Sequence, residues 1–221
     1  MRSSDQDRTA AARIRDAAIT EFAINGVAGT SIRAIAAAAG VSPALVIHHF
    51  GSKEALRVVC DEHVAAIIRD LKSEAMTSGA GFDPLAALAR QSEGPPANKY
   101  LARTLVDGSE HVAELVDELV ADAMAYTELG VANGMMTPTQ YPHERAAILT
   151  IWALGGLVLH EHLARLVGVD ITQDYSSDPK ALSRYVGPAI EIAAGYITET
   201  TKELMTQAFT DAAQGEKKEE A

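Results

Sequence analysis

The stretch that decides the fold is GVSPALVIHHFGSKEAL, residues 40–56. Gly40 ends a short segment with apolar residues at helical spacing, residues 32–39, and Ser42-Pro43 opens a second segment, residues 43–49. A serine side chain accepts a hydrogen bond from the first turn of a helix, and proline is favoured at the first helical position. Two short helices joined by a tight turn, with Val41 pointing inward at their crossing, predict a helix-turn-helix.

The second of these helices is expected to have two different faces. Val46 and Phe50 should point into the core, whereas Ala44, Leu45 and His48 should point outward. A short helix that is exposed on one face fits into a DNA major groove, which is ~12 Å wide.

Outward from this stretch, the chain reads as helical almost throughout. The apolar fraction is 48% and the aromatic fraction only 5%, so the core must be built mainly from Ala, Leu, Ile and Val. After a polar, frayed start at residues 1–8, helices are expected over residues 9–25, 32–39, 43–49, 53–78, from 84, over 98–107, 109–132, 142–166 and 179–213. Gly187-Pro188 should kink or split the last helix. The sequence shows no strand alternation and no internal repeat, so the predicted fold class is all-α.

Charge is distributed unevenly along the chain. The formal net charge is -11, yet residues 1–60 carry seven Lys and Arg against five Asp and Glu, and residues 61–221 carry twelve against twenty-five. A mildly basic head on an acidic body allows one face to approach a polyanion while the body stays away. An ordinary acidic protein with a less acidic first quarter has the same counts, so charge alone does not separate the two interpretations.

Composition also excludes several classes of protein. The single cysteine, Cys60, excludes a disulfide framework and a Cys-cluster zinc site, and it fits a reducing compartment. No charged-then-apolar leader opens the chain, and no stretch approaches ~20 uncharged apolar residues. We therefore expect a cytoplasmic protein without a membrane span, a metal or a cofactor.

The stretch 40–56, with the helical pattern before it, resembles the TetR family of bacterial transcriptional regulators. The resemblance is detailed over about residues 10–60, and the rest of the chain matches in length and helical character. It implies a three-helix helix-turn-helix DNA-binding domain at residues 1–55 and a helical ligand-binding and dimerisation domain at residues 56–213. A disordered tail is expected at residues 214–221.

Matched position by position, the resemblance assigns DNA contacts at the start of each helix in this region. Ser31 and Ile32 sit where the family contacts phosphate, and Arg33 where it touches a base or a phosphate. Lys53, at the start of the next helix, would neutralise a phosphate with help from the helix dipole. The predicted DNA-binding residues are Ser31, Ile32, Arg33, Ser42, Pro43, Ala44, Leu45, Ile47, His48, His49 and Lys53.

Within the recognition helix, the side chains are unusually apolar. Residues 43–45 occupy its base-reading start and offer no side-chain hydrogen bond to a base. Recognition of the DNA sequence must then depend on methyl contacts to thymine, on Arg33, on backbone groups and on DNA shape. Ile47 stands where the family usually has a phosphate-bonding tyrosine, which puts that contact in question, and His48 and His49 sit near the DNA backbone.

The same residues also have purely structural interpretations. Ser31, Ser42 and Ser52 would cap their helices whether or not DNA is bound. Arg33 on a surface helix is often simply solvated, and the two histidines could be surface residues with no ligand.

The body is expected to dimerise and to bind a ligand. The family pairs its last long helices into a four-helix bundle, which here predicts a dimer through residues 142–166 and 188–213. The expected seam uses Ile148, Ile151, Trp152, Gly155, Leu159 and Leu163 on the first helix and Ile190, Ala193, Ala194 and Ile197 on the second.

An apolar pocket between the middle helices would take a small apolar or amphipathic effector, whose binding swings the long helix 53–78 and releases the operator. The predicted ligand-binding residues are Tyr100, Arg103, Met124, Tyr126, Thr127, Trp152 and His160, although core packing explains the aromatic and Met positions as well.

An enzyme and a structural or protein-interaction module are the two alternatives to a regulator. His160-Glu161-His162 resembles a metal motif, but residues two apart on a helix point to different sides, and no HExxH, GxSxG, P-loop or GxGxxG sequence occurs. An enzyme is therefore not expected. A structural or protein-interaction module would explain the helices and the acidity, but not the short capped helix with its exposed outer face.

Overall fold

The fold is built from α-helices. The structure is a computed structural model that describes residues 2–92, 94–107, 111–176, 178–193, 195, 197–203 and 206–207. Its helices are α1 (Arg2–Gly29), α2 (Ile32–Ala39), α3 (Pro43–Phe50), α4 (Lys53–Ser78), α5 (Pro84–Ser92), α6 (Ala97–Asp107), α7 (His111–Ala132), α8 (Pro142–Val158), α9 (His160–Val167) and α10 (Pro179–Ala193). The described residues contain no strand beyond one isolated bridge between Met136 and Ile197, which confirms the predicted all-α class.

Serine and aspartate side chains begin several helices as the sequence predicts. Ser31, Ser42 and Ser52 each accept a hydrogen bond from the backbone N–H three residues later, at 3.0–3.2 Å. Asp83 does the same for the first turn of α5. Each bond satisfies an N–H that the helix itself leaves without a partner, so these caps fix where the helices start.

Helix α1 begins earlier than predicted and breaks where a stop was predicted. The predicted frayed start at residues 1–8 is wrong from Arg2 onward, since α1 begins there, in a stretch without glycine or proline. The predicted stop at Asn25-Gly26 is confirmed as a break, because Gly26 adopts φ 70° and ψ 164° inside α1.

The helix predicted over residues 142–166 is two helices. The chain turns by 76° between α8 and α9, at Leu159. Gly155 and Gly156 weaken the preceding turn. Just after the bend, His160 Nδ1 lies 3.0 Å from Asp170 Oδ1, which holds α9 in its new direction.

The predicted split at Gly187-Pro188 does not occur. Helix α10 continues through Pro188 and ends at Ala193, because a proline inside a helix removes one hydrogen bond without necessarily ending it. The expected unbroken helix to residue 213 is wrong, because residues 195, 197 and 198 are not helical, although residues 199–203 are. The predicted tail at residues 214–221 lies outside the described residues.

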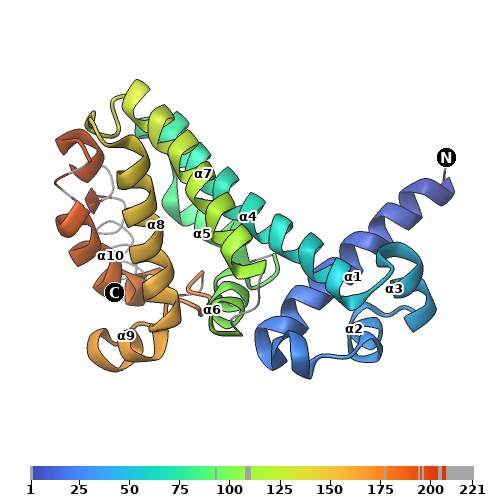
Figure 1. Cartoon of the computed structure of the whole chain (residues 1–221). Helices are drawn as coiled ribbons and strands as arrows, with labels where there is room; N and C mark the ends of the chain where they lie inside the picture. Colours follow the sequence, from blue (N-terminus) through green and yellow to red (C-terminus); the bar gives the residue numbers. More distant parts are fainter. Residues whose placement is uncertain are drawn as a thin grey trace, which may run out of the picture.

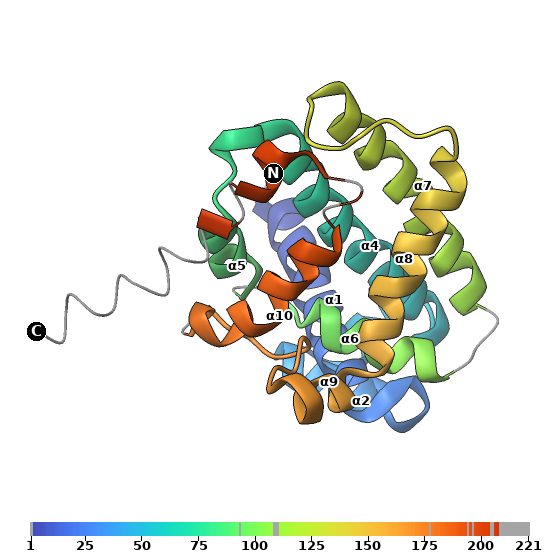
Figure 2. The same cartoon turned by 90° about the vertical axis from the view of Figure 1, so that its left-hand side faces the viewer.

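The elements form an elongated arrangement with the short helices at one end. Figure 1 shows α2 and α3 at one end, α8 and α10 at the other, and α4 running between them, and Figure 2 shows the molecule from the α8 and α10 end. The main core joins α1, α2, α3, α4, α6, α7 and α8, and α1 packs most extensively on α6. The predicted domain boundary at residues 55 and 56 falls within the first turn of α4, so this helix belongs to both ends.

In the part of the chain that the structure describes, no single helix is both long enough and apolar enough to cross a bilayer. The two helix pairs that reach that length together, α2 with α3 and α8 with α9, are bent by 103° and 76°. No group of three or more His, Cys, Asp or Glu among the same residues is placed to hold a metal ion.

Candidate nucleic-acid interface

Helices α2 and α3 form the helix-turn-helix. Gly40 takes the left-handed conformation, at φ 64° and ψ 39°, and its N–H and that of Val41 return to the carbonyls of Ala37 and Ala36 at 3.2 and 2.9 Å. This closing pattern stops α2 within one residue. The chain then turns by 103° into α3, which lies in the range of crossing angles that the motif uses.

Helix α3 is anchored on one side and open on the other. Val46 is fully buried, and Phe50 is partly buried against the same core. Ala44, Ile47 and His48 are exposed, with Ile47 at 45%. Leu45 is half-buried, so its predicted outward orientation is only partly right. Ile47 is the outward residue beside Ala44 and His48, since positions 44, 47 and 48 share one helical face.

The start of α2 presents polar side chains beside this open face. Ser31 and Arg33 are exposed, whereas Ile32 is half-buried and packs on the core. Ser31 also uses its hydroxyl to cap the helix. Arg33 is therefore the one charged side chain of α2, and it is exposed.

The two histidines of α3 differ in their surroundings. His48 is exposed, and its ring centroid lies 5.6 Å from that of His49 in an edge-on arrangement. His49 is half-buried, with its centroid 6.0 Å from that of Phe50. His48 is thus the more accessible of the two for a DNA backbone.

Lys53 is held by the protein itself. Its Nζ donates to the carbonyls of Val27 at 2.7 Å and Thr30 at 3.0 Å, and the buried Thr30 hydroxyl donates to the Gly26 carbonyl at 2.8 Å. The ammonium group therefore ties the start of α4 to the link between α1 and α2. Nothing in the sequence pattern signals this role, because the partners are carbonyls about 25 residues away.

The predicted effector residues differ in their burial and in their partners. Tyr100 is fully buried and donates a 2.6 Å hydrogen bond to Asp61, on α4. Burial, and then the neighbouring Asp61 carboxylate, raise the pKa of Tyr100, so the phenol remains a neutral donor. Arg103 lies at the contact with α1, where it pairs with Asp107 at 3.5 Å.

The remaining predicted effector residues are also scattered. Thr127 is buried, and its hydroxyl donates to the Ala123 carbonyl of its own helix at 2.7 Å. Met124 and Tyr126 are half-buried on the same helix, α7. Trp152 is 64% exposed on the surface of the single chain, and His160 is engaged by Asp170. Helical spacing alone does not reveal which side of α8 the body covers.

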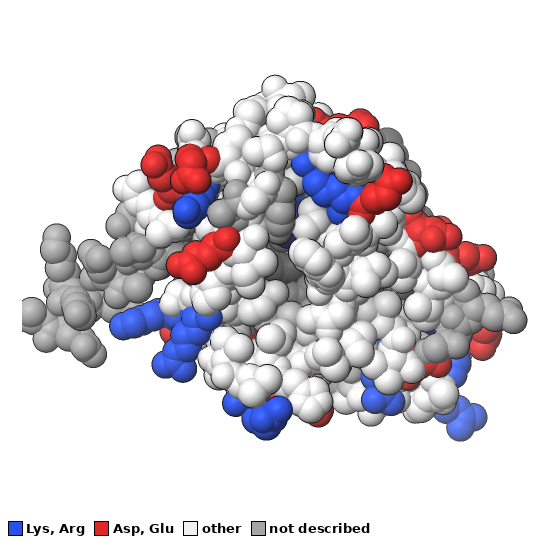
Figure 3. Space-filling model, turned by 60° about the vertical axis from the view of Figure 1, so that its left-hand side comes forward, with Lys and Arg blue, Asp and Glu red and all other residues white. Residues whose placement is uncertain are grey.

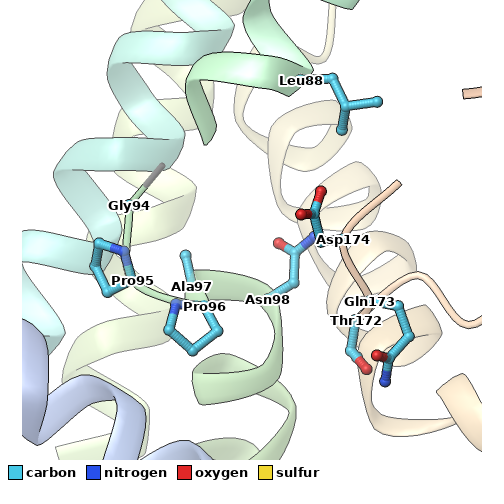
Figure 4. Close-up of a pocket in the computed structure, with 9 residues that line it drawn as sticks. All are labelled: Leu88, Gly94, Pro95, Pro96, Ala97, Asn98, Thr172, Gln173 and Asp174. Carbon is cyan, nitrogen blue, oxygen red and sulfur yellow. The ribbon is translucent and has the colours of Figure 1, made fainter. Parts of the chain in front are cut away.

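The structure instead contains a pocket at the start of α6. It has a volume of about 120 Å³ and lies between the segment Gly94–Asn98, Leu88 of α5 and residues 172–174 (Figure 4). None of the seven predicted effector residues lines it. In the sequence, Gly94-Pro95-Pro96 before α6 indicates only an interruption of the helical pattern and not a binding site.

Helix α8 carries an apolar face that this chain does not cover. Ile148, Ile151 and Trp152 are 49%, 54% and 64% exposed, and residues 146–158 include no charged side chain. Figure 3, which brings this side forward, shows a face whose middle is largely without Lys, Arg, Asp or Glu among the described residues. These three residues belong to the predicted dimer seam.

The second half of that predicted seam is partly wrong. Ile190 and Ile197 are 5% and 9% exposed, because they pack inside their own chain, whereas Ile192 is 73% exposed. Ala193 is half-buried, and Ala194 lies outside the described residues. The periodicity of α10 identified an apolar face but not which partner covers it.

Comparison with known proteins gives two family matches. Residues 14–59 match the family described as bacterial regulatory proteins, tetR family, and residues 93–198 match the tetracyclin repressor-like C-terminal domain. The chain is also 44% identical over 160 residues to the HTH-type transcriptional regulatory protein RaaS of Mycobacterium tuberculosis, covering 72% of this chain and 74% of the relative.

Solved structures show the same fold at lower identity. The TetR regulator TylP of Streptomyces fradiae has a TM-score of 0.58 at 20% identity, with 95% of this chain and 93% of TylP covered. CprB of Streptomyces coelicolor, solved in complex with its operator sequence, has a TM-score of 0.52 at 20% identity, with 96% and 99% covered. From the helix-turn-helix geometry, the two family matches and the 44% identical relative, we conclude that the chain belongs to the TetR family and is a transcriptional regulator with an N-terminal DNA-binding domain, not an enzyme.

Proposed function

We propose that the protein is a ligand-responsive repressor that binds a pseudo-palindromic operator as a homodimer and is released by a small apolar or amphipathic effector. The observation that carries this proposal is α3, a two-turn helix capped at Ser42, buried through Val46 and open on its opposite face. A regulator of this kind would act in the cytoplasm, where bacterial operators lie.

The proposed DNA surface combines α3 with the start of α2. Ala44 and Ile47 supply apolar contacts, Arg33 and His48 supply polar ones, and Ser31 flanks them. Pro43 and Leu45 would add to the apolar contacts, with Ile32, Ser42, His49 and Lys53 mainly positioning the two helices. Because the face contains little hydrogen-bonding capacity, each half-site should be read with modest specificity.

Dimerisation would compensate for a weak half-site. A twofold-symmetric pair places two recognition helices about one DNA turn apart, ~34–36 Å. The exposed apolar face of α8, with Ile148, Ile151 and Trp152, supports a seam on this helix, joined by a part of residues 188–213. CprB, which has this fold, was solved in complex with its operator sequence.

The proposed response to an effector depends on the helices that connect the two ends. Helix α4 runs from the DNA-binding end into the body, and α1 packs on α6, so a displacement of either would move α3. A shift between two such arrangements couples effector and operator binding by typically ~1–3 kcal/mol.

The test begins with selection of a binding sequence from random DNA duplexes, followed by gel-shift titrations over a range of salt concentrations. A specific binder shows a steep salt dependence and resists competitor DNA, whereas an interaction module shows neither. Arg33→Ala should weaken binding to the selected site by about 1–3 kcal/mol and reduce the preference over scrambled DNA, if Arg33 reads a base.

The matched control is Arg165→Ala on α9, which removes the same charge from an exposed position in the body. Its binding should equal that of the unmodified protein. If Arg33→Ala keeps the same preference for the selected site over scrambled DNA, Arg33 does not contact a base. If Arg165→Ala loses as much affinity as Arg33→Ala, the loss is explained by net charge alone.

A further inference from the structure

The pocket at the start of α6 has walls of two kinds. Leu88, Pro95, Pro96 and Ala97 provide apolar surface, and Asn98, Thr172, Gln173 and Asp174 provide polar groups (Figure 4). Its volume of about 120 Å³ is slightly smaller than that of an engineered cavity of about 150 Å³ that binds benzene. The space therefore accepts a molecule with a short aliphatic chain.

Hydrogen bonds already hold the polar side of this pocket in place. Asn98 donates from its amide nitrogen to the Ile171 carbonyl at 3.1 Å, and Gln173 donates to Asp170 at 3.2 Å. The Thr172 hydroxyl donates to Asp170 at 2.7 Å. The wall formed by residues 172–174 is thus preorganised, and among the described residues no donor reaches the amide oxygens of Asn98 and Gln173.

Charge determines which ligand this wall favours. Asp174 is the one ionisable residue among those that line the pocket in the described part of the chain, and its Oδ1 accepts the Ser176 N–H at 2.8 Å. A carboxylate and two amide oxygens are acceptors, so the complementary ligand donates hydrogen bonds and carries positive charge. The net negative charge of residues 61–221 raises the local concentration of cations further.

We infer that this pocket is a binding site for a small primary amine in its protonated form, with its ammonium group at Asp174 and its aliphatic chain against Leu88 and the two prolines. The site was not among the predicted effector residues, and it differs from the apolar pocket expected between the middle helices.

The same segment also faces the DNA-binding end. Gly94 and Pro95 line a second hollow of about 420 Å³, together with Arg13 and Thr20 of α1 and Ala39 of α2. A ligand that moves the stiff Pro95-Pro96 wall therefore changes the support of α1 and α2 directly. This second step, in which the amine acts as the effector, rests on the proposed function.

Calorimetry with the full-length protein tests the site itself. The probes are n-butylamine, n-butanol and butyrate at neutral pH and constant ionic strength. Butylamine should bind, and butanol and butyrate should bind more weakly or not at all. Equal binding of butanol, or preferential binding of butyrate, would overturn the inference.

Asp174→Asn tests the role of the charge. Asparagine keeps the oxygen that accepts from Ser176, so the loop should stay folded, yet butylamine affinity should fall by up to about fivefold, as expected for one exposed ion pair. Asp117→Asn on α7 is the control, since it removes an equal charge from an exposed position outside the pocket. Unchanged affinity in Asp174→Asn, or the same loss in Asp117→Asn, contradicts the site.

Hydrogen exchange, measured without DNA, tests the coupling. Butylamine should change the exchange rates of the amides of residues 36–41, and Asp174→Asn should abolish that change at the same amine concentration. Binding without any such change would disprove the coupling to α2. If both measurements succeed and the gel shifts show no specific DNA binding, the proposed function fails while the amine site stands.

Discussion

A hydrogen bond between Tyr100 and Asp61 connects two helices of the core. Their 2.6 Å hydrogen bond joins α6 to α4 in the core, and Arg57 lies 3.6 Å from the other carboxylate oxygen. Burial raises the pKa of Asp61, and the hydrogen bond from Tyr100 and the charge of Arg57 oppose that rise. A buried carboxylate of this kind depends on its donor.

Tyr100→Phe should lower the free energy of unfolding by about 1–3 kcal/mol, because it leaves the buried carboxylate without that donor. Loss of the hydroxyl raises the pKa of Asp61 further. An acid whose pKa is higher in the folded state destabilises the fold as it ionises. The deficit should therefore be smallest at about pH 4 and grow as pH rises, as measured by urea unfolding across pH.

Tyr141→Phe provides the control for this substitution, because Tyr141 is exposed, at 58%. Its stability should stay within about 0.5 kcal/mol of the unmodified protein. A Tyr100→Phe deficit that does not depend on pH would disconnect the loss from Asp61.

At the scale of elements, the turn between α2 and α3 depends on one backbone conformation. Gly40 has φ 64°, and a β-carbon added there would meet no atom within 4 Å. Any cost of substitution therefore comes from the backbone and not from crowding. Glycine is therefore favoured at this position by its backbone conformation and not by a lack of space for a side chain.

Gly40→Ala should lower the free energy of unfolding by about 1–2 kcal/mol, the cost of a left-handed conformation for a residue with a β-carbon. Gly40→Asn should lose less, because asparagine tolerates this conformation. Chemical denaturation of the three proteins checks the order. Equal losses in both variants would show that something other than the backbone conformation is responsible.

At the scale of the whole molecule, the exposed apolar face of α8 needs a partner. Ile148, Ile151 and Trp152 form one helical stripe in a stretch without charges. Contiguous apolar surface of this kind marks an interaction site, and tryptophan is frequently a main contributor to the binding energy of an interface.

Trp152→Glu should weaken dimerisation by about 2 kcal/mol or more, since it removes the aromatic anchor and places like charges at a twofold seam. Sedimentation equilibrium of the unmodified and substituted proteins measures the change. Ile24→Glu is the control, because Ile24 is similarly exposed, at 57%, on α1, outside the predicted seam. A dimer that persists in Trp152→Glu would exclude this seam.

The sequence determined most of the local structure. Serine caps, the left-handed glycine and the Ser42-Pro43 start depend on residues within three positions of one another, so their pattern predicted α2, α3 and the start of α4. The family resemblance and the all-α class followed from the same stretch. Even the inward orientation of Val46 was readable from helical spacing.

Only the tertiary structure decided which surfaces meet. Lys53 reaches carbonyls about 25 residues earlier, Tyr100 finds Asp61 39 residues away, and Trp152 faces outward although its helix is apolar on more than one side. The pocket at Asn98 and Asp174 joins segments more than 70 residues apart. Helical periodicity specifies a face but not its partner, because a partner is selected by the packing of the whole chain.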